Sequence, residues 1–284
     1  MNRLSRQKRA EVLALLVEGM SIRATVRVTG VAKNTITKLL TDLDQVCSDY
    51  QDATLRNLVC PVVQCDEIWS FCHSVAPEHE DEFGYGDVWT WTAIDADSKL
   101  VMSWLVGERT NRDAYVFLSD LKGRLRNNRV QITTDGHQPY LSVIEPLFGA
   151  DSVDFAMLHK IYGMTSGDHS PERTYSSAVC TGIDIRIIAG DPDPDRISTS
   201  YVERQNLTMR MGMRRFTRLT NAFSKKVENH AHAVSLHFMY YNFGRPHQTL
   251  TKRYGRPTTP AMAAGVSDYV WSFSDIAALL EPTA

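Results

Sequence analysis

The stretch VCPVVQCDEIWSFC (residues 59–72) decides the fold class, because it is an apolar segment of strand composition with two acids in its middle. Its Val, Ile, Trp and Phe residues are typical of a β-strand. Two further segments, VWTWTAIDADS (88–98) and KLVMSWLVGE (99–108), have the same character, and Asp97-Ser98 supplies a turn between them. We expect the three segments to form an antiparallel meander.

The segments that follow predict a mixed sheet flanked by helices. A helical pattern covers residues 112–126, a strand RVQITTDG covers 129–136, another helix runs through Leu147, and a fifth strand lies near 153–158. Three strands, helix, strand, helix, strand is the order of the ribonuclease H-like α/β fold. We interpret residues 160–200, rich in Gly, Pro, Ser and Asp, as an insertion or long loop with one short strand at 183–188. From Thr199 to about Asn242 the chain reads as largely helical.

Residues 1–45 predict a small all-α domain placed before the sheet. Three short helical patterns are separated by Gly19 and Gly30, and Ser21 is a candidate cap of the second one. This outline is typical of a helix-turn-helix, in which the front of the last helix enters the major groove of DNA. The residues at that front are Lys33, Asn34, Thr35 and Lys38. We expect a linker at 46–58, the catalytic domain at 59–250 and a tail at 251–284.

Composition is ordinary for a globular protein, with 43% hydrophobic and 23% charged residues among 284. No apolar run approaches the roughly 18 residues of a membrane span, and the N-terminus lacks a secretory pattern, so we expect a cytoplasmic protein without a membrane partner. The five cysteines have irregular spacing, which favours free thiols over a disulfide framework. Cys65, Cys72, His73 and His79 match no zinc-finger spacing, so zinc is not expected.

Charge is distributed unevenly along the chain, although the formal net charge is only −2. Residues 50–199 hold 12 basic and 23 acidic residues, whereas residues 200–256 hold 11 basic and 2 acidic ones. Residues 1–49 are also basic on balance. A polyanion is therefore a plausible partner of both basic segments, the alternative for the later one being a solvated basic helix.

Three acids could form a catalytic site. Asp66 lies inside an apolar strand, where an unpaired carboxylate is costly, and Asp135 ends the strand at ITTDG. Glu203 is the single acid of residues 201–226, at the edge of an apolar helical stripe. Three carboxylates brought together would repel unless hard divalent cations joined them, which suits two Mg²⁺ or Mn²⁺ ions. Glu67 is excluded, because neighbouring strand residues point to opposite faces.

Basic and polar residues around Glu203 would hold the phosphates of a nucleic acid in this scheme. They are Arg204, Asn206, Arg210, Arg214, Arg215 and Arg218. His137, two residues after Asp135, is placed to touch a scissile phosphate, and a structural turn histidine is the alternative. His159 and Lys160 at the end of the fifth strand are weaker candidates for such a contact.

The three acid-bearing motifs, taken together, resemble a known family. DEIWSF (66–71), TTDGHQPY (133–140) and YVERQNLTMR (201–210) follow an N-terminal DNA-binding unit in this order. They are similar to the DDE-type transposases of bacterial insertion sequences, and to the insertion-sequence-one group in particular. YNFGRPHQTL (241–250) resembles the end of integrase-type catalytic cores. The interval from Asp135 to Glu203 is longer than the group's pattern.

The resemblance implies a transposase that binds the terminal inverted repeats of a mobile element and cuts and joins DNA strands with Mg²⁺. It implies Asp66, Asp135 and Glu203 as metal ligands and Arg210 as a substrate phosphate contact. It also implies a homo-oligomer on double-stranded DNA, both element ends and target. Two alternatives stay open: a ribonuclease H-like nuclease that cuts without joining, and a DNA-binding regulator whose catalytic domain is inactive.

Overall fold

The computed structural model describes residues 4–73, 83–126, 128–163, 179–217 and 221–281. Its centre is a six-stranded mixed sheet with the strand order β3-β2-β1-β4-β5-β6. The parallel pairs are β1/β4 and β4/β5, and the other neighbouring pairs are antiparallel. The strands are β1 (Val62–Cys72), β2 (Gly86–Asp95), β3 (Val101–Gly107), β4 (Val130–Thr134), β5 (Val153–Gly163) and β6 (Val179–Ala189). The expected ribonuclease H-like sheet is thus confirmed.

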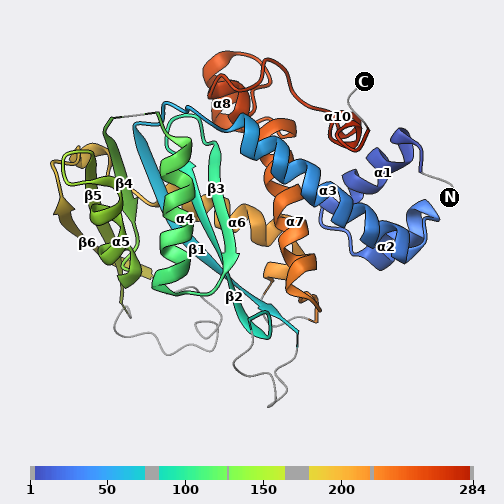
Figure 1. Cartoon of the computed structure of the whole chain (residues 1–284), viewed down its shortest axis with the longest axis horizontal. Coiled ribbons are helices and arrows are strands. Elements are labelled where there is room, and N and C mark those ends of the chain that lie inside the picture. The colour runs from blue at the N-terminus through green and yellow to red at the C-terminus, as the bar shows by residue number, and fades with distance from the viewer. Residues whose placement is uncertain (1–3, 74–82, 127, 164–178, 218–220, 282–284) are drawn as a thin grey trace.

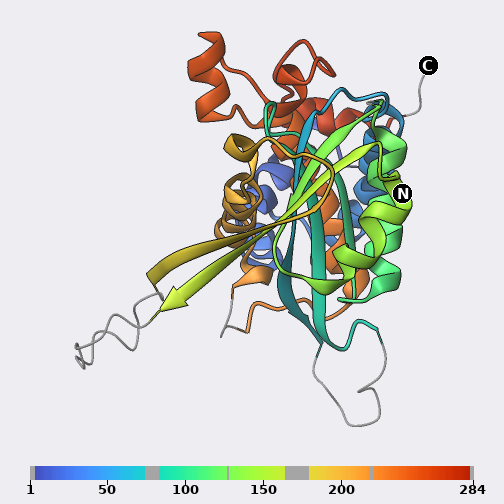
Figure 2. The same cartoon turned by 90° about the vertical axis from the view of Figure 1, so that its left-hand side faces the viewer.

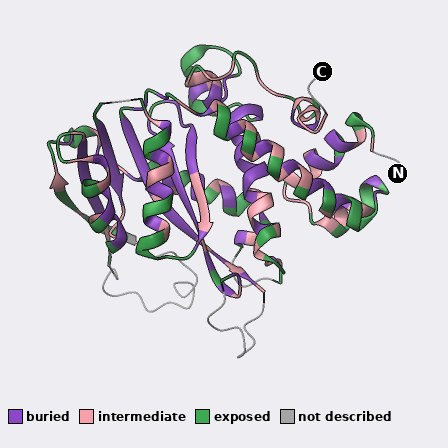
Figure 3. Cartoon of the chain, in the orientation of Figure 1, coloured by how far each residue is buried: buried purple, intermediate pink, exposed green. Residues whose placement is uncertain are grey.

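Helices cover both faces of this sheet (Figures 1 and 2). Helices α4 (Asn111–Arg124) and α5 (Gln138–Phe148) lie on one face, where Phe117 and Tyr140 are fully buried. Helix α6 (Ser200–Gly212) lies on the opposite face and buries Val202 and Met209 against Ile68 of β1. The strands are buried along most of their length, as Figure 3 shows. None of the helices in the described part of the chain is both long and apolar enough for a membrane span.

The N-terminal trihelical unit consists of α1 (Arg6–Val17), α2 (Ile22–Thr29) and α3 (Lys33–Thr54). The Ser21 hydroxyl accepts a hydrogen bond from the Ala24 amide at 3.1 Å and so caps α2, as the sequence predicts. Gly30 ends α2 with φ +71°, a left-handed conformation that side chains other than glycine rarely adopt. The three helices therefore begin close to the expected positions, and α1 and α2 also end there.

Helix α3 continues through residues 46–54, where the sequence analysis expects a polar connector. The reason is tertiary: Cys47 and Gln51 are fully buried, and Ser48 is hydrogen-bonded to Ser235 at 3.0 Å. Ser235 belongs to α7 (Val227–Met239), which runs beside α3 (Figure 1). The apolar residues of the trihelical unit share one core cluster with the sheet.

The interval 160–200 contains more regular structure than the composition indicates. Strand β5 continues to Gly163, and β6 pairs with it antiparallel, with Lys160 opposite Ile183 and Leu158 opposite Ile185. Residues 164–178 lie outside the described part. The segment is thus a long strand pair that projects beyond the sheet (Figure 2), rather than a loop with one short strand.

The expected long helix from Thr199 to Asn242 is interrupted. Helix α6 ends at Gly212, because Met213 is extended at φ −129° and ψ 104°. A short 3₁₀ turn follows at Arg214–Phe216, and α7 begins only at Val227. Between them Ser224 forms a bridge to Cys72 at the end of β1. Beyond a π-helical turn the chain forms α8 (Gln248–Tyr254), α9 (Pro260–Ala263) and α10 (Phe273–Ala278), so the tail expected at 251–284 contains helices.

Candidate active site

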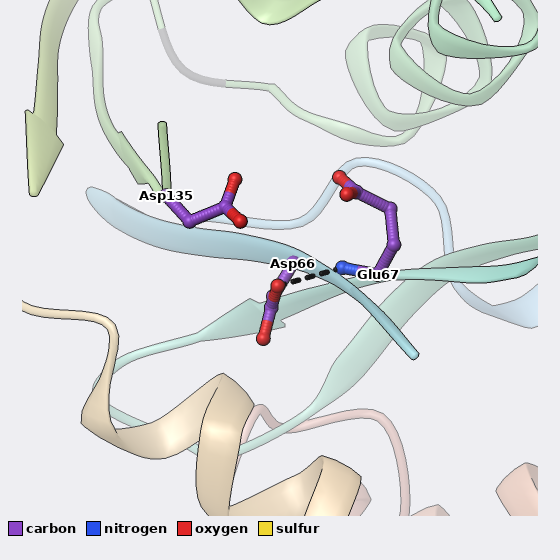
Figure 4. A group of neighbouring side chains, drawn as sticks. All are labelled: Asp66, Glu67 and Asp135. Carbon is purple, nitrogen blue, oxygen red and sulfur yellow. Dashed lines mark hydrogen bonds between the residues drawn. The ribbon is translucent and has the colours of Figure 1, made fainter. Parts of the chain in front are cut away.

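Asp66 and Asp135 lie side by side because of the register between two parallel strands. Cys65 of β1 is opposite Thr134, the last residue of β4, so the next residue of each strand is an aspartate. One carboxylate oxygen each from Asp66, Glu67 and Asp135 lie within 4.8 Å of one another (Figure 4). The structure therefore brings together the first two acids that the sequence singles out.

Two donors hold the Asp66 carboxylate. The Glu67 amide donates to Oδ1 and the Asn206 side-chain amide donates to Oδ2, both at 2.8 Å. Burial and the negative charge of Asp135 raise the pKa of Asp66 to about 7. Without a cation, this carboxyl group is therefore partly protonated near neutral pH, and ligands that bind its ionised form must displace a proton.

Helix α6 is docked onto β1 by side-chain amides at two points. The Gln64 side-chain oxygen accepts hydrogen bonds from the Tyr201 and Val202 amides at 2.8 and 3.2 Å, which satisfies the first turn of the helix. One turn later Asn206 reaches Asp66. Gln64 and Asp66 lie two residues apart on one strand, so they present their side chains to the same face. These contacts fix the helix that carries Glu203.

Glu203 lies in the first turn of α6 and is bound by two neighbours. The Thr199 hydroxyl donates to its Oε1 at 2.6 Å, and the Lys160 ammonium group on β5 forms an ion pair with its Oε2. The charge of Glu203 contributes to the raised pKa of Asp66, after burial and Asp135. Among the described residues, Glu203 is not part of the close group formed by Asp66, Glu67 and Asp135.

Glu67 is the residue that the sequence analysis excludes and the structure brings into the cluster. Its side chain does leave β1 on the side opposite to Asp66, as expected, but Asp135 turns its carboxylate toward it (Figure 4). Arg109 donates to Glu67 Oε2 from Nε at 3.2 Å, and its Nη2 lies 3.7 Å from Asp135 Oδ2. Burial and the Asp135 charge raise the pKa of Glu67 to about 8. The sequence feature that could have identified Glu67 as a member of the cluster is its position directly after Asp66 in a buried strand.

Two buried polar atoms around the acids, His137 Nε2 and Asn206 Oδ1, have no hydrogen-bond partner among the described residues. The Tyr140 hydroxyl and the Glu67 carboxylate, also buried, interact with each other. Buried polar atoms are normally satisfied, so the two unpaired atoms indicate a place where water, an ion or substrate belongs. Crowded carboxylates with raised pKa values and a spare amide oxygen are the hard donor set that Mg²⁺ or Mn²⁺ prefers. The residues present therefore fit a divalent cation.

Gly136 and His137 directly follow Asp135 in the chain and form part of its surroundings. The His137 amide donates to Asp135 Oδ1 at 3.0 Å. Burial, together with the Arg109 charge, lowers the pKa of the His137 imidazole to about 4, so it is neutral at pH 7. A Cβ atom at Gly136 would overlap the His159 imidazole, so a larger residue here would require that ring to move.

The basic residues of 201–226 do not form one continuous surface. Arg204 and Arg210 lie on the exposed side of α6, and Arg214 is exposed on the following turn. Asn206 is instead buried against Asp66. Arg215 donates to the Ser224 hydroxyl at 2.8 Å and to the Asn229 carbonyl oxygen at 2.9 Å, which is a structural contact. Arg218 lies outside the described residues.

The helix-turn-helix candidates are at the surface. Lys33, Asn34, Thr35 and Lys38 are all exposed, and the Lys38 ammonium group is bound to Asp42 at 2.7 Å. The cysteines of the described residues are free thiols, and Cys65 and Cys72 are buried. His79, the fourth residue of the group that matches no zinc-finger spacing, lies outside the described part of the chain.

No protein-family model and no curated protein matches the chain. Among solved structures, a piggyBac transposase synaptic complex with hairpin DNA is 8% identical, with a TM-score of 0.48 over 95% of this chain and 71% of that one. A pre-cleavage Mos1 transpososome is 12% identical, with a TM-score of 0.24 over 55% of this chain and 60% of that one. Because both TM-scores lie below 0.5, neither likeness is evidence for the function of this chain.

Proposed function

We propose that the chain is a DDE-type transposase, a polynucleotidyl transferase that cleaves and joins DNA strands. One observation carries the proposal: Asp66 and Asp135 lie side by side, and Asp66 is hydrogen-bonded to the helix that presents Glu203. The motifs around these acids support a bacterial insertion-sequence enzyme, of the insertion-sequence-one type.

Asp66, Asp135 and Glu203 would hold two Mg²⁺ or Mn²⁺ ions, and Asn206 Oδ1 is a further oxygen within the same surroundings. When bound, such ions activate a water molecule or a 3′-hydroxyl group and stabilise the leaving oxygen of an in-line phosphoryl displacement. The Gln64 and Asn206 amides keep α6, and with it Glu203, at a fixed place on the sheet.

Substrate phosphates would be held by the exposed arginines of α6. Arg204 and Arg210 lie on the same helix as Glu203, so a backbone bound along them runs past the acids. His137 is neutral, which suits a hydrogen bond to a phosphate oxygen but not a charge contact. The exposed residues at the front of α3 would read the element ends in a major groove.

The test is a strand-transfer assay on DNA that contains the sequences flanking the coding region. With Mg²⁺, the wild type should cleave at the element ends and join the released 3′ ends to a target. Asp66→Asn, Asp135→Asn and Glu203→Gln should each lower cleavage by at least about 1,000-fold, because each removes the negative charge of a proposed metal ligand. Glu228→Gln, an exposed acid in the first turn of α7, is the matched control.

Undiminished cleavage in Asp66→Asn or Glu203→Gln would remove the proposed site. Products that are cut but never joined, under conditions where target DNA is present, would show a nuclease instead. If the three variants bind DNA as tightly as the wild type, and no divalent metal ion supports cleavage by the wild type, the protein is a regulator with an inactive catalytic domain.

A further inference from the structure

Strand β6 forms one edge of the sheet and has unusual length for that position. It runs for 11 residues, Val179–Ala189, and pairs only with β5 in the sheet. Natural proteins keep edge strands short or place charges, proline or bulges along them, because a free row of amides and carbonyls invites another strand. Only two residues of this strand, Asp184 and Arg186, are charged. Its pairing with β5 shifts register near both ends, where Thr181 and Ile188 have no direct partner, so the regular stretch open to another strand is Gly182–Ile187.

The side chains of β6 are apolar and exposed on one face. Ile183, Ile185 and Ile187 alternate along the strand and are 57%, 46% and 57% exposed. They face the same side of the sheet as Leu158 of β5, the partner of Ile185. A row of three exposed isoleucines on an edge strand is a surface that another apolar strand would cover.

At the opposite edge of the sheet, a side chain is hydrogen-bonded to the backbone of the edge strand β3. At β3 the Asn242 side chain donates to the Val101 carbonyl oxygen at 2.9 Å and accepts from the Val101 amide at 3.0 Å. This amide occupies backbone groups that a neighbouring strand would otherwise use. Asn242 is fully buried, so the contact is part of the core. At β6 the Cys180 thiol donates to the Gly182 carbonyl oxygen at 3.3 Å, a contact that lies outside the stretch Ile183–Ile187.

The two charges of β6 stand on either side of its middle isoleucine. Asp184 and Arg186 form an ion pair at 3.0 Å within the strand. In an antiparallel pair centred on Ile185, Asp184 of one copy lies opposite Arg186 of the other, and Arg186 lies opposite Asp184. The same register places Ile183 opposite Ile187. The strand is therefore complementary to itself in both charge and apolar pattern.

We infer that β6 is a dimerisation strand, which pairs antiparallel with β6 of a second copy about a two-fold axis at Ile185 and joins the two sheets. A two-fold interface requires one patch that complements itself, and this strand meets the requirement. Nucleic acid is a poor occupant, because the strand carries no net charge and its exposed face is aliphatic. The inference concerns the free protein and does not depend on the proposed chemistry.

Charge reversals test the pairing and its register. Sedimentation analysis without DNA should show a monomer–dimer equilibrium for the wild type. Asp184→Arg places arginine opposite arginine twice, and Arg186→Asp places aspartate opposite aspartate twice, so each should weaken dimerisation at least about tenfold. An equimolar mixture of the two variants should form a heterodimer, and the double variant should again form a homodimer, because unlike charges then face each other.

Lys8→Glu, at an exposed helical ion pair remote in sequence from β6, is the control and should leave the equilibrium unchanged. Circular dichroism and melting of each variant verify that the monomer is folded. A wild type that stays monomeric up to about 100 μM would overturn the inference, because a specific dimer should be populated at that concentration. Single variants that dimerise normally, or a mixture and a double variant that fail to restore the dimer, would overturn it as well.

Discussion

The ammonium group of Lys160 on β5 is bound to the carboxylate of Glu203 on α6. In the free protein this lysine supplies the positive charge beside an acid that we propose as a metal ligand. Arg109 has the same relation to Glu67 and Asp135 on the other side of the cluster. The acids of the site are therefore partly neutralised by side chains, and divalent cations compete with these internal charges.

Removal of Lys160 should consequently strengthen metal binding. The Lys160→Met variant should bind Mn²⁺ about two- to fivefold more tightly in the absence of DNA, the range expected for a partly exposed ion pair. Electron paramagnetic resonance of free Mn²⁺ measures both affinity and stoichiometry. Lys122→Met is the control, because that ammonium group is bound to a carbonyl oxygen of Leu147 at 2.7 Å. Weaker Mn²⁺ binding in Lys160→Met would show that Lys160 supports the site rather than competing for it.

The raised pKa of Asp66 predicts a pH-dependent stability of the metal-free protein. Its pKa is about 7 in the folded state, mainly through burial and the Asp135 charge, against 3.8 ordinarily. Between these values the folded state binds more protons than the unfolded chain, so the free energy of unfolding falls as pH rises and levels off above about pH 7. Glu67, with a pKa of about 8, extends the fall.

Asp66→Asn should therefore be more stable than the wild type at pH 8 in EDTA, by about 1–3 kcal/mol. The difference should shrink toward pH 5, where the wild-type carboxyl group is protonated. Urea unfolding at the two pH values measures it, with Glu228→Gln as the control. Excess Mg²⁺ should stabilise only the wild type and so reverse the order. A difference that does not change with pH would contradict the assigned pKa.

Much of the sheet follows from composition, whereas the contacts of the site do not. Val, Ile and Trp in 59–72 and 88–108 are strong strand signals, and the motif order was enough to expect Asp66 beside Asp135. The role of Gln64 could not be predicted, because its partners lie at residues 201 and 202. Residues 46–54 look polar locally, yet burial against α7 keeps them helical. Arg215 reads as a surface base, but its acceptors come from residues 224 and 229.

Asn206 provides a second test of the site, because its uncharged side chain connects α6 to Asp66 by a hydrogen bond. Asn206→Ala should lower Mn²⁺ affinity about 10- to 100-fold, the usual cost of losing an outer hydrogen bond to a metal ligand. Far-ultraviolet circular dichroism should stay unchanged, since the Gln64 contacts still hold the helix. Thr208→Ala, which removes only a bond to the Arg204 carbonyl oxygen, is the control. Unaltered Mn²⁺ affinity would mean that Asp66 needs no orienting partner.

The proposed DNA contact of the trihelical unit predicts a difference between two lysines at the front of α3. Both are exposed; Lys38 forms an ion pair with Asp42 at 2.7 Å, whereas Lys33 forms none with the acids in the described part of the chain. A lysine that contacts a phosphate releases about one counterion, so Lys33→Ala should lower the slope of log affinity against log salt by about one. Lys38→Ala should lower it less, because Asp42 already balances part of that charge. Fluorescence anisotropy with labelled end DNA at several salt concentrations measures both slopes, and equal slopes in wild type and Lys33→Ala would remove α3 from the interface.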